Sequence, residues 1–212
     1  MNSTIIIATG GTLGHWAIRH IPDDALLIGA DSGAVFLLDN GRIPAVAIGD
    51  FDSITDEEMA RIRQACPTVI TCDPIDKNYT DTEMAFQHAM AMKPREIVLL
   101  GAIGTRFDHS LANVHLLALA EENGIDAKII DEHNEIRVVS SVAAIRRGPY
   151  DTVSLLPLSQ EVTGITLSGF QYPLRDASLT VGQSLGISNV LLGQSGTVQL
   201  ASGRLIVIQS RD

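Results

Sequence analysis

Hydrophobic residues in the first two-thirds of the chain occur as short continuous runs separated by amphipathic stretches. The runs cover residues 5–8, 26–30, 45–48, 68–71, 97–100 and 127–130. Each run ends near glycine, aspartate or another residue that favours a turn. Continuous apolar character, rather than strict alternation, is typical of strands buried on both faces of a mainly parallel sheet.

Helices are expected between these runs. Two stretches open with Thr-x-x-Glu, at Thr55 and Thr80, the pattern of a capping box. A third stretch carries apolar residues at helical spacing and stops at Gly124. The predicted helices cover residues 59–66, 84–92 and 110–123. Strands alternating with helices predict a doubly wound α/β domain.

The pattern changes from about residue 136. Helix-forming residues thin out, and short apolar segments at 153–156, 165–167, 185–187, 198–200 and 205–208 are punctuated by Gly, Ser and Pro. That rhythm predicts antiparallel strands in a small sandwich or barrel. Charge changes too: residues 1–133 hold 9 basic and 20 acidic side chains, and residues 134–212 hold 6 and 5. We therefore expect an α/β domain over 1–133 and a β-sandwich over 134–212, with the boundary between residues 131 and 150.

Composition excludes several classes of protein. With 212 residues, 45% of them hydrophobic, the chain can bury a substantial core, unlike a disordered or coiled-coil protein. No run approaches the ~18 consecutive apolar residues of a membrane span. The net charge of −10 argues against nucleic-acid and anionic-membrane partners. An N-terminus without a basic region, together with only two cysteines, leads us to expect a cytoplasmic protein.

Polar residues gather where the predicted strands end, which is where open α/β sheets bind ligands. Five consecutive strand ends carry acidic or hydroxyl groups, four of them together with glycine, and two add a cation, Lys77 or Arg106. The acids in these loops are Asp31, Asp50, Asp52 and Asp81. Such carboxylates repel one another unless a cation compensates them, and Mg²⁺ prefers a few carboxylates together with phosphate oxygens. The pattern indicates a metal–nucleotide site for phosphoryl transfer.

Taken one at a time, these residues also have ordinary structural explanations. Asp81 in a first helical turn would stabilise the helix dipole, and Asp108 could be an N-cap. The Gly-Gly turn at residues 10–11 could bring N–H groups to a phosphate, but it matches neither a Walker loop nor a dinucleotide fingerprint. Asp50 and Asp52 give a stronger signal, because alternate residues of an extended segment face the same side. The functional interpretation rests on the recurrence of such residues.

Four motifs resemble, in order and spacing, those of the thiamine pyrophosphokinase (thiamine diphosphokinase) family. They are Ala30-Asp31-Ser32-Gly33-Ala34, Gly49-Asp50-Phe51-Asp52-Ser53-Ile54, Lys77-Asn78-Tyr79-Thr80-Asp81-Thr82-Glu83, and residues 101–109 with Leu111-Ala112-Asn113. In the second part, Tyr172-Pro173-Leu174 and Gly186-Ile187-Ser188-Asn189 look like the family's thiamine-binding β-domain. The chain departs from the family's usual residues at Asn78, Ile103, Thr105 and Val190.

The resemblance implies a fold, a reaction and a set of site residues. The implied protein is a homodimer with an N-terminal α/β nucleotide-binding domain and a C-terminal β-sandwich, and it transfers the diphosphoryl group of ATP to the hydroxyl of thiamine, releasing AMP. Mg²⁺ and the triphosphate would be held by Asp31, Asp50, Asp52 and Asp81, and the expected catalytic residues are Asp50, Asp52 and Asp81. ATP would be bound by Asp31, Lys77, Thr80, Arg106, Asp108 and His109, and thiamine by Ser188 and Asn189.

Two other functions stay open at this stage. A pyrophosphokinase acting on another small alcohol, such as a pterin, would share the first domain and differ in the β-domain pocket. A non-catalytic nucleotide-binding or thiamine-sensing module is the second alternative. The full set of acids counts against the module, since a sensor has no need for four metal-facing carboxylates.

Overall fold

In a computed structural model that describes residues 4–71 and 78–212, the chain forms two units, Met1–Glu132 and His133–Asp212. The first unit is built on parallel strands in the order β4-β3-β2-β1-β5-β6. These strands are β1 (Thr4–Ala8), β2 (Leu26–Ala30), β3 (Val46–Gly49), β4 (Thr68–Thr71), β5 (Glu96–Leu100) and β6 (Asp126–Ile130). They coincide closely with the six continuous apolar runs, and the predicted parallel sheet is confirmed.

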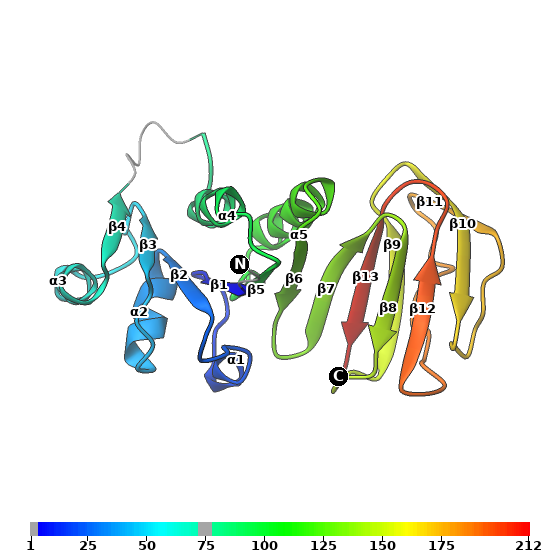
Figure 1. Ribbon diagram of the computed structural model, residues 1–212, viewed down its shortest axis with the longest axis horizontal. Helices are drawn as coiled ribbons and strands as arrows, with labels where there is room; N and C mark the ends of the chain where they lie inside the picture. Colours follow the sequence, from blue (N-terminus) through cyan, green and yellow to red (C-terminus); the bar gives the residue numbers. More distant parts are fainter. Residues whose placement is uncertain (1–3, 72–77) are drawn as a thin grey trace. The chain divides into compact units, whose positions relative to one another are not determined.

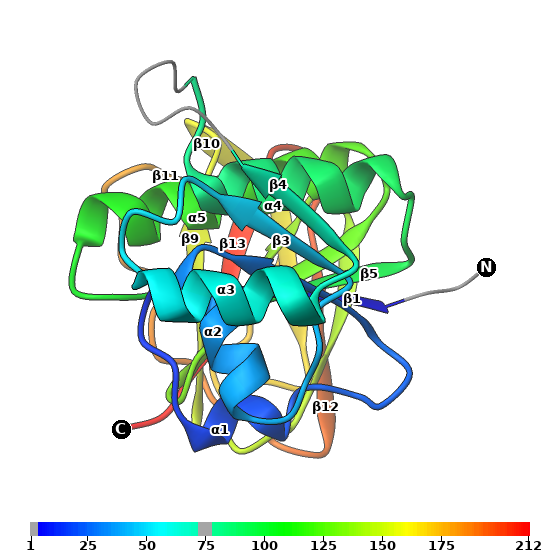
Figure 2. The ribbon, with the colours of Figure 1, turned by 90° about the vertical axis from the view of Figure 1, so that its left-hand side faces the viewer.

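Helices cover both faces of this sheet (Figures 1 and 2). They are α1 (His15–Ile18), α2 (Ser32–Asp39), α3 (Asp56–Ala65), α4 (Asp81–Ala91) and α5 (Phe107–Glu122). α1, α2 and α3 lie on one face, and α4 and α5 lie on the other. The predicted doubly wound α/β fold is therefore confirmed.

The sequence of crossovers creates a switch point at the centre of the sheet. From β1 to β4 each new strand is added beside the last, with helices on one face. The chain then returns through α4 and places β5 on the other side of β1. Connections leaving β1 and β5 thus diverge to opposite faces, which opens a crevice at the carboxyl ends of these two strands.

Apolar residues on both faces of the strands form the core of this unit. On one face, Ile6 of β1 and Leu100 of β5 pack in a cluster with Trp16 of α1 and Leu37 of α2. On the other face, α4 contacts β1, β2 and β3, and its Phe86 is completely buried. Strands with apolar partners on both sides need continuous apolar runs, which explains the pattern seen in the sequence.

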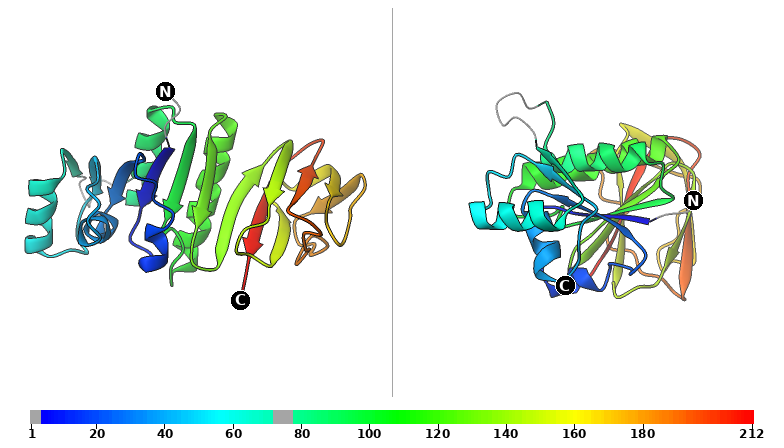
Figure 3. Two further views of the ribbon diagram at one scale, coloured as in Figure 1. Left: turned by 60° about the horizontal axis from the view of Figure 1, so that its bottom comes forward. Right: turned by 60° about the vertical axis from the view of Figure 1, so that its left-hand side comes forward.

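The second unit consists of antiparallel strands in two groups, β7-β13-β9 and β11-β10-β12-β8. Its strands are β7 (Asn134–Val139), β8 (Val142–Arg146), β9 (Thr152–Pro157), β10 (Glu161–Ser168), β11 (Ala177–Thr180), β12 (Ser195–Gln199) and β13 (Leu205–Ser210). Residues of both groups, among them Leu155, Ile165, Val198 and Val207, share one buried cluster. The predicted antiparallel β-sandwich is confirmed; Figure 3 gives two further views of it.

Some local expectations were wrong. Residues 185–187 form turns rather than a strand, and Leu185 and Ile187 are exposed. Within the second unit, residues 134–146 form β7 and β8, and the chain passes between the two groups of strands at residues 140–141. The short helices α1 and α2 were not predicted; α2 is largely buried, so it shows little of the polar face that marks an amphipathic helix. Among the described residues, no helix combines the length and apolarity needed to cross a membrane.

Candidate active site

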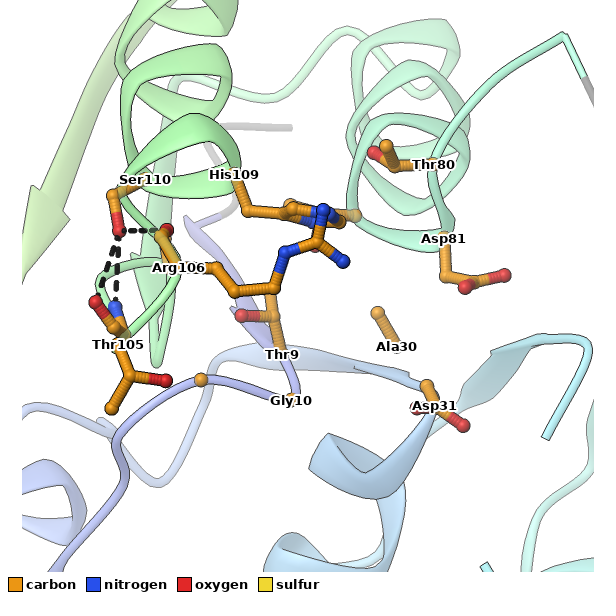
Figure 4. A pocket seen from close by; sticks show the side chains of 14 residues that line it. Thr9, Gly10, Ala30, Asp31, Thr80, Asp81, Thr105, Arg106, His109 and Ser110 are labelled. Atoms are coloured by element: carbon orange, nitrogen blue, oxygen red, sulfur yellow. Dashed lines mark hydrogen bonds between the residues drawn. The ribbon is translucent and has the colours of Figure 1, made fainter. Parts of the chain in front are cut away.

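A cavity of ≈ 290 Å³ lies at the carboxyl ends of the central strands of the first unit. Its walls come from residues 9–11 after β1, 30–31 at the end of β2, 80–82 at the start of α4, and 102, 104–106, 109 and 110 after β5. Figure 4 shows Arg106 and His109 directed into this space, with Asp31 and Asp81 to one side of it. The cavity occupies the switch point, where the fold leaves a crevice.

The loops after β1 and β5 are joined by main-chain hydrogen bonds. The Gly11 N–H donates to the Gly101 carbonyl at 2.9 Å, and the Thr12 N–H donates to the Ile103 carbonyl at 2.9 Å. A Cβ on Gly11 would lie 2.1 Å from the Gly101 oxygen, so this approach requires glycine. The sequence suggested that N–H groups of this turn approach a phosphate. Those of Gly11 and Thr12 instead hold the neighbouring loop.

Three side chains fix the loop that follows β5. Thr9 Oγ1 donates to the Gly101 carbonyl at 2.6 Å, and Asn113 Nδ2 donates to the Ala102 carbonyl at 2.8 Å. Ser110 Oγ accepts from the Gly104 N–H at 3.1 Å. All three side chains are buried. No sequence motif indicated a separate role for any of them; for Ser110 and Asn113, the available signal was a polar residue on the buried face of α5.

Cationic and imidazole groups stand at the start of α5. Arg106 and Asp108 form an exposed ion pair at 2.6 Å, with 68% and 65% of their side-chain surfaces accessible. The hydrogen bond from Arg106 lowers the pKa of Asp108 to about 2. Arg106 and His109 line the cavity, whereas Asp108 is absent from its described wall. The Asp108 carboxylate instead accepts a hydrogen bond from Arg106. Lys77, the other predicted cation, lies outside the described residues.

The acidic residues predicted to share a site do lie close together. Carboxylate oxygens of Asp31, Asp50 and Asp52 all lie within 4.8 Å of one another. Asp81 adjoins them, because its Oδ1 accepts a hydrogen bond from the Asp50 N–H at 3.2 Å. These side chains come from the ends of β2 and β3 and from the first turn of α4, so three separate elements supply the cluster.

Asp31 occupies an unusual position in this cluster. Its backbone has φ 51° and ψ −129°, a conformation that favours glycine, and its N–H donates to the Ile48 carbonyl at 2.9 Å. Its Oδ2 accepts from Ser53 Oγ at 2.6 Å, whereas its Oδ1 is buried and has no hydrogen-bond partner among the described residues. Burial raises the pKa of Asp31, hydrogen bonds from Ser53 and Ser32 oppose that rise, and the charges of Asp81 and Asp52 add to it.

These features fit a divalent cation. A buried carboxylate oxygen without a partner, next to two further carboxylates, is a hard-oxygen donor set with uncompensated negative charge. Mg²⁺ matches this chemistry, since it takes one or two carboxylates and completes its shell with water and phosphate oxygens. The cavity thus has an acidic side able to hold a metal and a side with Arg106 and His109 able to hold an anion.

In the second unit, the predicted substrate residues Ser188 and Asn189 differ in environment. Ser188 is exposed, with φ 57°, and its N–H donates to the buried Ser154 Oγ at 3.0 Å. Asn189 is buried, and its side chain binds Tyr172 twice: Oδ1 accepts from the N–H at 3.0 Å and Nδ2 donates to the carbonyl at 2.7 Å. Oδ1 also accepts from the Val190 N–H at 2.9 Å. The Asn189 amide therefore joins its own loop to the segment that contains Tyr172.

Comparison with known proteins gives one consistent family. A model described as "Thiamin pyrophosphokinase, catalytic domain" matches residues 19–129, and one described as "Thiamin pyrophosphokinase, vitamin B1 binding domain" matches residues 134–205. A thiamine pyrophosphokinase of Bacillus subtilis (strain 168) is 38% identical over 198 residues, covering 90% of this chain and 89% of that protein.

Solved structures agree with the sequence comparison. The crystal structure of thiamine pyrophosphokinase from Bacillus subtilis superposes with a TM-score of 0.92 at 36% identity, covering 99% of this chain and 100% of that one. The crystal structure of thiamin pyrophosphokinase from Geobacillus thermodenitrificans gives a TM-score of 0.89 at 34% identity, covering 99% and 98%. The likeness extends over both units.

Proposed function

The chain belongs to the thiamin pyrophosphokinase family, and we propose that it transfers the diphosphoryl group of ATP to the hydroxyl of thiamine, giving thiamine diphosphate and AMP. The observation that carries this proposal is the cavity at the switch point, where clustered carboxylates face an arginine and a histidine. Residues 1–133 would form the catalytic, nucleotide-binding domain, and residues 134–212 the thiamine-binding domain.

The predicted site residues, in the cavity wall and beside it, receive separate roles. Asp31, Asp50 and Asp52 would hold Mg²⁺, with Asp81 beside them. Arg106, His109 and Thr80 would bind the nucleotide, Asp108 would hold Arg106 in place, and Lys77 stays a predicted ATP-binding residue. When bound, Mg²⁺ would offset the negative charge of the phosphate oxygens.

In the reaction, the thiamine hydroxyl oxygen bonds to the β-phosphorus of ATP while the bond from that phosphorus to the α,β-bridging oxygen breaks. The hydroxyl proton passes to a carboxylate, for which Asp50 and Asp81 are the candidates, and AMP leaves with the bridging oxygen. Arg106 stabilises negative charge on the phosphates, and the cavity aligns the reactants. Catalysis by this chain is therefore mainly positioning and electrostatics.

Two further properties follow from the family rather than from the cavity. We infer a homodimer, and we keep the cytoplasm as the predicted location because it supplies ATP and reduced thiols. Ser188 remains our candidate for direct contact with thiamine, because its side chain is exposed next to a loop that Ser154 and Asn189 fix.

The direct test is product analysis. Purified protein is incubated with ATP, Mg²⁺ and thiamine, and AMP, ADP and thiamine diphosphate are separated by chromatography. We expect AMP and thiamine diphosphate in equal amounts and only with Mg²⁺. The Asp50→Asn variant should lose most of this turnover, whereas Asp126→Asn, at the exposed start of β6, should keep it. ADP in place of AMP would contradict diphosphoryl transfer, and product with a pterin but not thiamine would favour the other pyrophosphokinase.

A further inference from the structure

Buried polar side chains in the first unit all converge on one loop. Among its described residues, the buried polar side chains are Thr9, Ser110 and Asn113, with 1%, 7% and 7% of their surfaces accessible. Each of them hydrogen-bonds to the loop of residues 101–106, which connects β5 to α5. We refer to these three side chains as the anchor residues.

The loop that they hold forms one wall of the cavity. Residues 102 and 104–106 line it, and Arg106 at the end of the loop carries the guanidinium group expected to contact the nucleotide. The anchors reach successive points along the loop: Thr9 the carbonyl of Gly101, Asn113 that of Ala102, and Ser110 the N–H of Gly104. Ser110 Oγ also donates to the Arg106 carbonyl at 3.1 Å, so the hold extends to the start of α5.

Without the anchor residues, ordering the 101–106 loop on ligand binding would cost conformational entropy. Fixing each residue's backbone costs conformational entropy, and this six-residue segment includes Gly101 and Gly104, which lose the most. If the loop were disordered before binding, that entropy would be subtracted from the affinity for the nucleotide. Burying a polar side chain costs free energy unless it is hydrogen-bonded. Because these buried polar side chains all hydrogen-bond to the loop in the cavity wall, their arrangement favours a role in ordering that loop.

We propose that Thr9, Ser110 and Asn113 are positioning residues, which hold the 101–106 loop in its nucleotide-binding form before the nucleotide arrives. This inference rests on the proposed function in one respect, namely that ATP occupies the cavity. Asn113 is the most informative of the three, because it is absent from the described cavity wall and acts on it only through the Ala102 carbonyl. Thr9 and Ser110 line the cavity as well as anchoring the loop.

The principal test compares Asn113→Ala with Asn123→Ala. Asn123 lies at the other end of α5, where its exposed side chain donates to the Leu119 carbonyl at 2.7 Å, so it is a chemically matched control far along the same helix. Hydrogen exchange of the protein without ligand reports on the loop, and steady-state kinetics give separate KM values for ATP and thiamine. For Asn113→Ala we expect faster exchange over residues 101–106 and a KM for ATP raised about tenfold. The KM for thiamine should be unchanged.

A second pair guards against a variant that fails to fold. Thr9→Val removes the hydroxyl with almost no change of shape, and Thr9→Ser restores it. Exchange over residues 101–106 should be faster and the KM for ATP higher in Thr9→Val, and both should return toward the wild-type values in Thr9→Ser. If Asn113→Ala and Thr9→Val lose thermal stability but keep the loop exchange and the KM for ATP of Asn123→Ala, the anchors are merely structural and the inference is wrong. Failure of the proposed function looks different: the wild type itself would then form no thiamine diphosphate.

Discussion

At the scale of single residues, Asp31 combines backbone strain with an unsatisfied carboxylate. A non-glycine residue at φ 51° and ψ −129° costs of order 1–3 kcal/mol and persists only where its surroundings fix it. Here the N–H and the carbonyl of Asp31 are both engaged, with Ile48 and Ala34 respectively. Backbone strain at a residue whose carboxylate belongs to the acidic cluster supports our proposal that Asp31 serves in the site.

Asp31→Gly should therefore separate stability from activity. Glycine relieves the backbone strain and removes one of the repelling carboxylates, while the hydrogen bond from Ser53 is lost. We expect the free energy of unfolding in denaturant to stay the same or rise by up to ~1 kcal/mol, and turnover to fall at least about 100-fold. Asp31→Asn, which keeps the side chain's shape but not its charge, is the control. A Gly variant that retains turnover would remove Asp31 from the site.

Asn189 and Ser188 are neighbours in sequence with opposite environments. The Asn189 side chain is buried and its amide forms hydrogen bonds to Tyr172 and Val190, whereas the Ser188 side chain is exposed. The sequence motif led us to treat both as thiamine ligands. Burial was not visible in that motif, because it depends on the distant Tyr172 segment.

Substitution by alanine should distinguish these two residues. Asn189→Ala removes a buried amide and its hydrogen bonds to the Tyr172 N–H and carbonyl, so we expect a loss of ~2 kcal/mol in the free energy of unfolding together with a higher KM for thiamine. Ser188→Ala should change stability by less than ~0.5 kcal/mol, so a change in its KM would report direct contact. Equal stabilities for the two variants in denaturant titrations would show that the Asn189 hydrogen bonds are not structural.

At the scale of elements, local sequence signals set the helix ends well. Thr55 and Glu58 form the complete capping box expected at the start of α3. At α4 only half of the expected box is seen: Thr80 Oγ1 accepts from the Glu83 N–H at 3.1 Å, while the Glu83 side chain accepts from Gln87 at 3.2 Å. The same Thr80 that caps the helix also lines the cavity, so the motif serves both fold and site.

Neighbouring strands are also linked by an ion pair at the amino end of the sheet. Glu96 of β5 binds Lys128 of β6 at 2.8 Å and accepts from Thr4 of β1 at 3.3 Å, and each charged side chain is 19% exposed. Burial by itself would raise the pKa of Glu96, but hydrogen bonding and charge from Lys128 outweigh it, so the pKa lies below its usual value of 4.5. The folded state therefore binds the Glu96 proton less readily than the unfolded state.

The pH dependence of stability follows from that direction. Because the pKa of Glu96 is lower in the folded state, Glu96 contributes to the free energy of unfolding at pH values above its unfolded pKa of 4.5. This contribution is lost as the pH falls through its folded pKa. Glu96→Gln should lower the free energy of unfolding by ~1 kcal/mol at neutral pH, with the difference from wild type shrinking below about pH 4.5. Asp39→Asn, in the exposed pair with Arg61, is the control and should change stability less. A difference independent of pH would contradict this assignment.

At the scale of the whole molecule, two differently built units serve one proposed reaction. The first unit buries its core on both faces of a parallel sheet, and the second buries one shared cluster between antiparallel strands. The acidic excess belongs to residues 1–133, where the metal and nucleotide are expected to bind. Repulsion among these acids implies that ligands, rather than the protein alone, compensate part of this charge.

Ligand binding should therefore stabilise the protein in a metal-dependent way. A ligand present at 100 times its Kd stabilises the folded state by ~2.7 kcal/mol. We expect Mg²⁺ and ATP together to raise the melting temperature, and EDTA to abolish both this rise and turnover without unfolding the protein. Asp50→Asn should show a much smaller rise. An equal rise with ATP in the absence of divalent cations would show that the acidic cluster does not hold the metal for the nucleotide.

Local sequence patterns were enough to predict the strands of the first unit, two helix starts and the acids of the site. Continuous apolar runs predicted the strands of the first unit, Thr-x-x-Glu patterns predicted two helix starts, and acids at strand ends predicted the Asp31, Asp50 and Asp52 cluster. The strands and helix starts could be read because they depend on residues close together in the chain, and the acidic cluster could be read because parallel strands bring their carboxyl ends to one edge of the sheet. Periodicity, capping and the rule that ligands bind at the carboxyl ends of strands need no knowledge of distant partners.

Which polar groups contact one another depends on the packing of the whole chain. The bond from Thr9 to Gly101 joins residues 92 positions apart, and it exists because β5 is placed beside β1 by the return crossover. The same placement engages the Gly11 amide, and other long-range contacts bury Asn113 against the loop and turn Asn189 inward to Tyr172. Burial and hydrogen-bond satisfaction are properties of the packed chain, so the sequence shows polar residues at positions 110 and 113 but not that their side chains hydrogen-bond to the 101–106 loop.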